Sequence, residues 1–368
     1  MPNPTLRSLA KELGLSRTTV SDALRGSPRV KQDTIKRVLA AADAAGYQRN
    51  PLTGTVMSLL RRSGGQDFRG VIGAVDFVPT NRTRHAQRYA DAVVTGINLR
   101  ANELGFKVER FEVGPNGMHL KRLDTILHTR GIQALVILPA VGFPDLSDLN
   151  WNRYTAVYAD YYIDRPALHC VCSDHYRSMV ALLHEVHRRG YRRPGLYMDI
   201  FLDERLQFRW EGAFVALQKY LPDIAEVPPL RVQSLNRKNF LEWFNRYQPD
   251  VVFGHDGDVL AWMREDGAKV PETTGYVSLN SLRAPEGSAC LDLQSGQLGA
   301  RAAELVTAQL LHNELGIPAQ PSLTTISALL VEGHTLPSKK PEKAAEPKKR
   351  VAKKKTAATT TRRKTTVK

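Results

Sequence analysis

Residues 5–30 read TLRSLAKELGLSRTTVSDALRGSPRV, and this stretch decides the fold of the N-terminal part of the chain. Leucine and alanine recur at helical spacing in its first half. Gly14 follows directly, where a tight turn needs a positive φ that glycine adopts readily. Ser16 then supplies a side-chain oxygen that can cap a second helix, which carries Val20 on its apolar face and ends at Gly26. The pattern predicts two short helices that cross closely, as in a helix-turn-helix.

The polar face of the second helix has side chains that suit nucleic acid. Hydroxyl, guanidinium and carboxylate groups can contact base edges and phosphates. The residues on this face are Arg17, Thr18, Thr19, Ser21, Asp22 and Arg25. An ordinary helical hairpin with a solvated polar face has the same pattern, so this stretch alone leaves both interpretations open.

Residues 31–46 predict a third helix that covers the apolar side of this pair. The residues expected on its buried face are Ile35, Val38, Leu39 and Ala42, which follow the i, i+3, i+4, i+7 spacing. Gly46 stands where a helix C-cap is expected. Three helices in about 45 residues bury little surface, so we expect a domain of marginal stability.

A basic connection follows this domain. Asn50-Pro51 breaks the chain, and proline is favourable at the first position of a helix over residues 52–60. Gly54 makes that segment a poor helix on its own. Residues 61–65 (RRSGG) form a flexible basic exit. We expect the segment to become ordered only when it is bound.

Positive charge is concentrated at both ends of the chain. The 368 residues carry a net charge of +15, of which residues 1–62 hold +7 and residues 339–368 hold +11, so the middle is at −3. This asymmetry favours a polyanionic partner that the ends contact. Residues 337–368 contain almost no large apolar side chains, so we expect a disordered tail. Its expected role is charge-driven contact with nucleic acid, and a solubilising tail is the alternative.

Composition narrows the remaining classes of protein. A hydrophobic content of 42% is enough for a sizeable core. No apolar run approaches the length of a membrane span, and the N-terminus lacks the apolar region of a secretory signal. The three cysteines fit a reducing compartment, so we expect a cytoplasmic protein. Cys170 and Cys172 point the same way in a strand-like run, but only two histidines lie nearby, so no metal site is expected.

From Arg69 onward the chain alternates buried strands and amphipathic helices. Continuous apolar runs are typical of parallel strands. Two such series in succession predict two doubly wound α/β lobes, with a ligand between them at the carboxyl ends of the strands. The expected strands are 71–76, 107–111, 134–138, 155–159, 195–198, 229–232, 251–254, 275–277 and 324–331. The expected helices are 87–104, 120–130, 178–189, 206–220, 237–247, 258–265 and 295–315.

Residues 4–336 resemble the LacI/GalR family of bacterial transcription regulators. The most specific segments are GLSRTTVSDAL at 14–24, GSPRV at 26–30, RVLAAADAAGY at 37–47 and NPL at 50–52. The resemblance implies a helix-turn-helix head, a hinge helix with a linker, and a periplasmic-binding-protein-like effector and dimerisation domain. The corresponding ranges are 1–49, 50–68 and 69–336, followed by the tail at 337–368. The first lobe would comprise about 69–165 and 292–322, and the second about 166–291 and 323–336.

The resemblance places the helix of residues 16–25 in the major groove of DNA. Arg17 and Thr18, at its start, would read bases, and arginine can form a bidentate pair with guanine. Asp22 departs from the family, whose members often carry a basic residue there. It either accepts from cytosine or pairs with Arg25 on the helix face. Other residues implied at the DNA are Leu6, Ser16, Thr19, Ser21, Arg29, Val30, Tyr47 and Asn50.

The same resemblance makes residues 51–60 a hinge helix that meets its copy from a second chain in the minor groove. Val56 stands where leucine is usual, so a shorter side chain would lever open the central base step, with Met57 as the alternative wedge. Leu52 is implied at the same interface. A plain linker is the alternative interpretation.

In the 69–336 domain the resemblance implies an effector site between the lobes. The residues implied there are Phe77, Tyr89, Arg209, His255, Asp256 and Asn280. Arg209 matches the arginine that commonly binds effector, although a surface arginine is the alternative. His255 and Asn280 replace an asparagine and an aspartate, so the usual sugar or nucleobase effectors do not follow. Phe77 and Tyr89 would stack on the ligand or belong to the core, and Asp174 is expected to cap a helix.

These expectations define a ligand-modulated transcription regulator, most simply a repressor, that binds a near-palindromic operator on double-stranded DNA as a homodimer associated with the nucleoid. A solute receptor for transport would have an export signal and no head domain. A nucleoid-type architectural protein driven by the tail is a further alternative. No Gly-rich phosphate loop, nucleophile elbow or metal-ligand set indicates an enzyme, and no cofactor is expected.

The least expected residue of the opening stretch provides a first test. We expect Asp22→Arg to change which operator half-site is preferred, because the charge would be reversed beside the bases. Selection of bound sequences from a randomised duplex pool measures the preference. An unchanged preference would make Asp22 a helix-face charge only.

Overall fold

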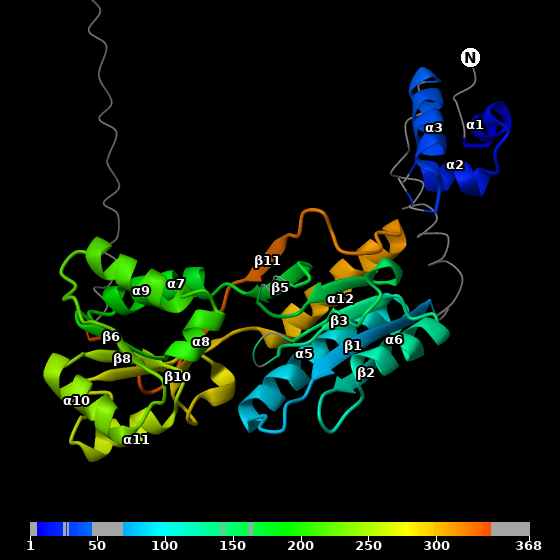
Figure 1. Ribbon diagram of the computed structural model, residues 1–368. Coiled ribbons are helices and arrows are strands. Elements are labelled where there is room, and N and C mark those ends of the chain that lie inside the picture. The colour runs from blue at the N-terminus through cyan, green and yellow to red at the C-terminus, as the bar shows by residue number, and fades with distance from the viewer. Residues whose placement is uncertain are drawn as a thin grey trace, which may run out of the picture. The chain divides into compact units, whose positions relative to one another are not determined.

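The computed structural model describes residues 6–24, 27, 29–45, 69–140, 142, 144–161 and 165–339 (Figure 1). The chain divides into two compact units, which we call the head (residues 1–68) and the body (residues 69–368). The hinge and tail predictions, together with Gly26 and Gly46, lie outside the described residues.

The head contains helices α1 (Leu6–Leu13), α2 (Arg17–Ala23) and α3 (Gln32–Ala44). Gly14 has a φ of +66°, as the predicted turn requires. The Ser16 side chain accepts a hydrogen bond from the backbone N–H of Thr19 at 3.0 Å, which confirms the predicted N-cap. The buried core of the head is Leu9, Ala10, Val20, Ala23, Ile35, Val38 and Ala42.

One predicted core residue of the head is wrong. Leu39 is 48% exposed, whereas Val38 beside it is fully buried. Successive residues point about 100° apart around a helix, and a domain of three short helices covers only a narrow stripe of α3. Ile35, Val38 and Ala42 fill that stripe, so Leu39 lies at its exposed edge.

The first lobe of the body is built on a parallel sheet. Among the described residues this sheet has six strands, in the order β11-β5-β4-β3-β1-β2. Their bounds are β1 Gly70–Phe77, β2 Phe106–Val113, β3 Ala134–Ile137, β4 Thr155–Tyr158, β5 His169–Ser173 and β11 Leu323–Ile326. Helices α5 (Arg84–Glu103) and α12 (Ser295–His312) cover one face, and α6 (Leu120–Thr129) covers the other. A single 3-10 turn, η1 (Trp151–Arg153), precedes β4.

The second lobe has the same layered construction. In the described part of the chain its sheet has the order β12-β10-β9-β8-β6-β7, with only β12 antiparallel. Its strands are β6 Pro194–Asp199, β7 Leu230–Val232, β8 Val251–Gly254, β9 Gly275–Ser278, β10 Ala289–Asp292 and β12 Leu329–Val331. Figure 1 shows α7 (His175–Arg188) and α9 (Arg209–Tyr220) on one face and α10 (Arg237–Tyr247) and α11 (Asp258–Glu265) on the other. The predicted fold class is therefore confirmed.

The structure corrects the predicted lobe boundaries. The strand expected at 324–331 is two strands, because the chain leaves the first sheet after Ile326 and enters the second at Leu329. The strand-like run that contains Cys170 and Cys172 is strand β5, and it also belongs to the first sheet, beside β4. The first lobe thus extends to Ser173 and Ile326 rather than to about residues 165 and 322. Apolar runs mark strands but do not tell which sheet a strand joins.

The helix expected at 206–220 is also interrupted. It is a short helix, α8 (Ile200–Arg205), followed by α9 from Arg209. Gln207 and Phe208 lie between them with φ values of 56° and 54°. Helical periodicity continues across the break, so the break was not visible in the sequence.

Three chain crossings connect the lobes and are hydrogen-bonded to one another. The backbone N–H of Asp174 donates to the carbonyl of Ile326 at 2.8 Å. The Gln294 amide donates to the carbonyl of Ser327 at 2.6 Å. Asp174 also caps α7 through its side chain, as predicted. The crossings therefore form one joined hinge at the base of the space between the lobes.

Helices α5 and α12 of the first lobe cross closely at glycines. A Cβ atom on Gly96 would lie 1.8 Å from the carbonyl oxygen of Gly296, whereas a Cβ on Gly296 would meet nothing within 4 Å. We therefore expect Gly96→Ala to lower the free energy of unfolding by about 2 kcal/mol or more, because the helices must separate. Gly296→Ala is the matched control and should be neutral or stabilising by up to about 1 kcal/mol.

Urea unfolding followed by tryptophan fluorescence measures both variants. Each of the four tryptophans lies after residue 150, so the signal reports on the body alone. Equal stability of the two variants would contradict the close crossing.

Candidate functional site

The start of α2 presents the polar residues predicted to contact DNA. Arg17 and Thr18 are exposed. The Thr19 hydroxyl lies 2.8 Å from the Ser16 hydroxyl, so these two side chains hold the helix start together. Asp22 is half-buried, and its carbonyl accepts from the backbone N–H of Ser27 at 3.0 Å.

The remaining predicted DNA contacts fall into two groups. Arg29 is exposed, and Val30 packs against the core of the head. The others lie outside the described residues or have side chains outside them. These are Leu6, Ser21, Arg25, Tyr47, Asn50, Leu52, Val56 and Met57.

In the body, an ion pair crosses from one lobe to the other. Arg205, at the end of α8, contacts the carboxylate of Asp160, which follows β4, at 2.6 Å. The same guanidinium donates to the carbonyl of Ala140 at 3.2 Å. Asp160 is only 7% exposed, so this charge would be costly to bury without its partner. The pair therefore closes one side of the space between the lobes.

Four aromatic and imidazole rings form a continuous row, which we call the ring wall, between Tyr161 of the first lobe and His255 of the second. Centroid distances are 5.7 Å from Tyr161 to His175, 4.9 Å from His175 to Trp210 and 5.8 Å from Trp210 to His255. The Arg209 guanidinium lies over the Tyr161 ring at 4.8 Å. The wall thus runs from the segment after β4, past the starts of α7 and α9, to the residue after β8.

Polar atoms without partners are concentrated in this ring wall. In the described part of the chain, buried side-chain atoms without a hydrogen bond are Tyr161 Oη, His175 Nδ1, Arg209 Nε, Trp210 Nε1 and His255 Nε2, together with atoms of Asp203 and Thr307. A buried polar group without a partner costs on the order of 1–3 kcal/mol. Such a cluster is typical of a surface that hydrogen-bonds a ligand.

Both histidines of the wall are held neutral. Burial lowers the pKa of the His175 imidazole to about 3, and the Arg205 guanidinium adds to the shift. Burial lowers the pKa of His255 well below its ordinary value, with Arg283 and His175 contributing. Neutral imidazole can donate through one nitrogen and accept through the other.

A pocket of about 230 Å³ lies at the carboxyl ends of β6 and β8, beside this wall. Its lining includes Asp199, His255, Asp256 and Arg283. The Tyr197 hydroxyl donates to the carbonyl of Asp256 at 2.6 Å and fixes the loop after β8. The predicted pair His255-Asp256 is thus placed at a strand end that faces a pocket.

Asn280, which follows β9, has a structural role in addition to the predicted one. Its side-chain oxygen accepts from the backbone N–H of Leu282 at 2.9 Å, and so caps the 3-10 turn η2 (Ser281–Arg283). That turn carries Arg283 into the pocket lining and packs against α5 of the first lobe. Asn280 therefore positions Arg283.

The two predicted stacking residues lie mainly against the core. Phe77 packs against the cluster beneath α6, and Tyr89 against the cluster beneath α5 and α12. Tyr89 also neighbours Asp160 and Arg205, and burial raises the pKa of its hydroxyl. Of the two, only Tyr89 reaches the inter-lobe ion pair.

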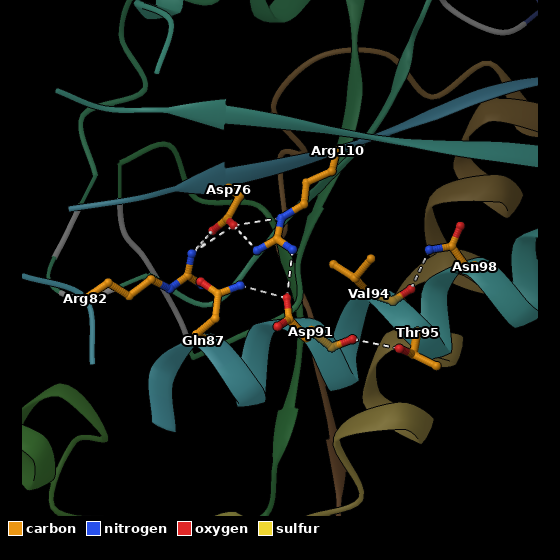
Figure 2. A network of polar contacts seen from close by, with 8 residues as sticks. All are labelled: Asp76, Arg82, Gln87, Asp91, Val94, Thr95, Asn98 and Arg110. Carbon is orange, nitrogen blue, oxygen red and sulfur yellow. Dashed lines mark hydrogen bonds and ion pairs between the residues drawn. The ribbon is translucent and has the colours of Figure 1, made fainter. Parts of the chain in front are cut away.

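The end of β1, next to Phe77, carries a closed network of charges (Figure 2). The fully buried Asp76 carboxylate accepts from Arg82 at 2.9 Å and from the Arg110 Nε at 2.9 Å. Arg110 also donates to Asp91 at 2.8 Å, and Gln87 donates to the same Asp91 oxygen. Figure 2 shows these groups turned toward one another, so this corner of the first lobe is internally compensated.

Several residues of the site were not predicted. They are Asp160, Tyr161, His175, Arg205, Trp210 and Arg283. Tyr161, His175 and Arg283 follow soon after β4, β5 and β9, so the rule that ligands bind at carboxyl ends of strands would have found them. Arg205 depends on the unforeseen break between α8 and α9, and the sequence carries no signal for it.

No group of three or more His, Cys, Asp or Glu among the described residues could hold a metal ion. Their helices include none that is long and apolar enough to cross a membrane. Cys170, Cys172 and Cys290 are buried and form no disulfide.

Burial of His175 as a neutral ring makes stability depend on pH. The unfolded chain binds a proton there near pH 6.5, whereas the folded protein does so only near pH 3, so stability falls as pH falls through this window. Between pH 7 and pH 5, we expect the free energy of unfolding of His175→Phe to fall by about 2 kcal/mol less than that of the wild type.

The measurement is urea unfolding at the two pH values. Burial raises the pKa of Asp203 to about 6, which has the opposite sign but is common to both proteins. His184→Phe, at an exposed position of the same helix, is the control and should retain the wild-type difference. If His175→Phe had the same difference in unfolding free energy between the two pH values as the wild type, this result would contradict a buried neutral ring at His175.

Both the head and the body are similar to known proteins. The family profile described as bacterial regulatory proteins, lacI family, matches residues 5–50. The HTH-type transcriptional regulator GntR of Pseudomonas aeruginosa is 25% identical over 332 residues, which cover 85% of this chain and 91% of that protein.

Two solved structures show the fold of nearly the whole chain. The transcriptional regulator CelR in complex with cellobiose has a TM-score of 0.54 at 19% identity, covering 90% of this chain and 99% of its own. The lac repressor dimer bound to operator and the anti-inducer ONPF has a TM-score of 0.52 at 16% identity, with the same coverage. The chain therefore carries a DNA-binding head of the lacI family of bacterial regulatory proteins, joined to a periplasmic-binding-protein-like body with the fold of that family's solved members.

Proposed function

We propose that this transcription regulator is a repressor that binds a near-palindromic operator as a homodimer and responds to a small molecule between its lobes. The observation that carries the DNA-binding part is the exposed pair Arg17 and Thr18 at a helix start fixed by Ser16. In a helix-turn-helix, the N-terminal residues of this helix contact base edges. A homodimer would present two such helices to half-sites about one helical turn apart.

The ligand part of the proposal is supported by the ring wall and its unpartnered polar atoms. The wall joins the two lobes, because Tyr161 of the first lobe contacts His175 of the second. A ligand that contacts both lobes favours one angle between them and so shifts the population of DNA-competent protein. The related solved structures hold cellobiose or ONPF, which are ligands of those proteins.

We propose a binding protein rather than an enzyme, acting on chromosomal DNA in the cytoplasm. The relatives described above are regulators by name. A direct test is selection of duplexes from a randomised pool by the full chain. Binding no tighter than to scrambled duplex would contradict the proposal.

Arg17 allows a sharper test of base reading. With the selected duplex, we expect Arg17→Ala to reduce discrimination against single-base changes at one position per half-site by about 1–3 kcal/mol. Lys36→Ala, at an exposed position of α3, is the control and should leave the base preference unchanged.

Titrations at several salt concentrations separate the two roles. A base-reading arginine changes preference at one position, whereas a phosphate contact lowers affinity for all sequences and reduces the salt slope by about one. Uniform weakening by Arg17→Ala would make it a phosphate contact only.

A further inference from the structure

Arg283 stands out among the arginines of the body. It is half-buried in the lining of the pocket beside His255. Within the described residues its guanidinium has no hydrogen bond or ion pair, and burial lowers its pKa. Four other buried or half-buried arginines, Arg82, Arg110, Arg189 and Arg205, contact carboxylates, and half-buried Arg192 donates to backbone carbonyls. Arg283 thus carries a positive charge that the protein does not directly compensate.

Arg283 acts on titratable groups of both lobes. Burial lowers the pKa of His85, at the start of α5 in the first lobe, and Arg283 and Arg88 add to this shift, whereas Asp256 opposes it. Burial also lowers the pKa of His255 in the second lobe, and Arg283 contributes. At the other end of the ring wall, Arg209 contacts the Tyr161 ring and makes a long 3.4 Å contact to Gln207. In the described part of the chain, neither Arg209 nor Arg283 forms an ion pair with a carboxylate.

Two carboxylates line the same pocket but do not pair with Arg283. Asp199 accepts from the backbone N–H of Leu202 at 3.2 Å, and Asp256 accepts from that of Asp258 at 3.0 Å. Each carboxylate is held in place by a nearby backbone N–H and can still accept hydrogen bonds from a ligand in the pocket. Carboxylates of this kind accept hydrogen bonds from ligand hydroxyl groups, as do the neutral imidazoles of the wall.

We propose that the ligand of this cleft is a small hydroxylated acid, whose carboxylate or phosphate is bound by Arg283 and whose hydroxyls are bound by Asp256 and the ring wall. The proposal rests on the proposed function for the existence of a ligand and adds its chemical class. A guanidinium binds an oxyanion through two parallel, charge-assisted hydrogen bonds. A neutral sugar would use the hydroxyl-binding groups but leave the charge of Arg283 without a partner.

The class is tested with compounds that share a carbon skeleton and differ in charge. Three series serve as probes: glucose, glucuronate and glucose 6-phosphate; ribose, ribonate and ribose 5-phosphate; glycerol, glycerate and glycerol 3-phosphate. Inorganic phosphate reports binding of a bare anion. The apparent Kd of each probe is measured on the full chain without DNA, by thermal shift and tryptophan fluorescence.

We expect an acid of at least one series to bind roughly tenfold or more tightly than its neutral parent, and Arg283→Met to abolish most of that difference. Carboxylate and phosphate members distinguish the two sources of the oxyanion. Arg264→Met, at an exposed position of α11 in the same lobe, is the matched control and should bind like the wild type.

Tightest binding by a neutral parent, an acid preference that survives in Arg283→Met, or no response to any acid would each overturn the proposal. The readout is independent of DNA, so its outcome is separate from that of the operator test. Acid binding without sequence-specific DNA binding would remove the proposed function and leave the ligand class. Specific DNA binding with no preference for an acid would support the proposed function and overturn the ligand class.

Discussion

The arrangement of the body depends on the hydrogen bonds that join its three inter-lobe crossings. Each lobe has its own sheet and its own buried core, so either could take many orientations if a single strand of chain connected them. The bonds from Asp174 to Ile326 and from Gln294 to Ser327 make the three crossings one unit. Relative motion of the lobes is therefore restricted to bending at this unit, and the facing strand ends stay opposite each other.

Charge compensation differs between the two lobes, and this difference gives the space between them its chemistry. Asp76 in the first lobe receives two guanidiniums in the closed network of Figure 2, and its corner is satisfied within the protein. Arg209 and Arg283 in the second lobe have no such carboxylate. Buried or half-buried charge is expensive unless it is paired, so the second lobe provides the groups that gain most from a ligand.

Sequence patterns predicted the head and the layered lobes well, because these features are determined by residues close together in the chain. The φ of Gly14, the cap at Ser16 and the apolar strand runs each depend on a few neighbouring residues. The exposed Leu39, the break before Arg209 and the sheet to which β5 belongs depend on long-range packing, which periodicity does not contain. His255 and Asp256 were implied by the family resemblance and lie at the end of β8, whereas Arg205 reaches Asp160 only through the break before α9.

Two cations of the second lobe reach the first lobe, and only one has a partner there. Arg205 is neutralised by Asp160, which holds the lobes together without a ligand. Arg283 lies on η2, which packs against α5, and within the described residues it forms no ion pair with the carboxylates of its pocket. An oxyanion bound at Arg283 would complete a second link across the same space. Its binding energy would then favour closure of the lobes, because the compensation is greatest when η2 and α5 are close. A neutral ligand has no such differential effect on the charge of Arg283, so the charge of the ligand and its effect on the angle between the lobes would be physically connected.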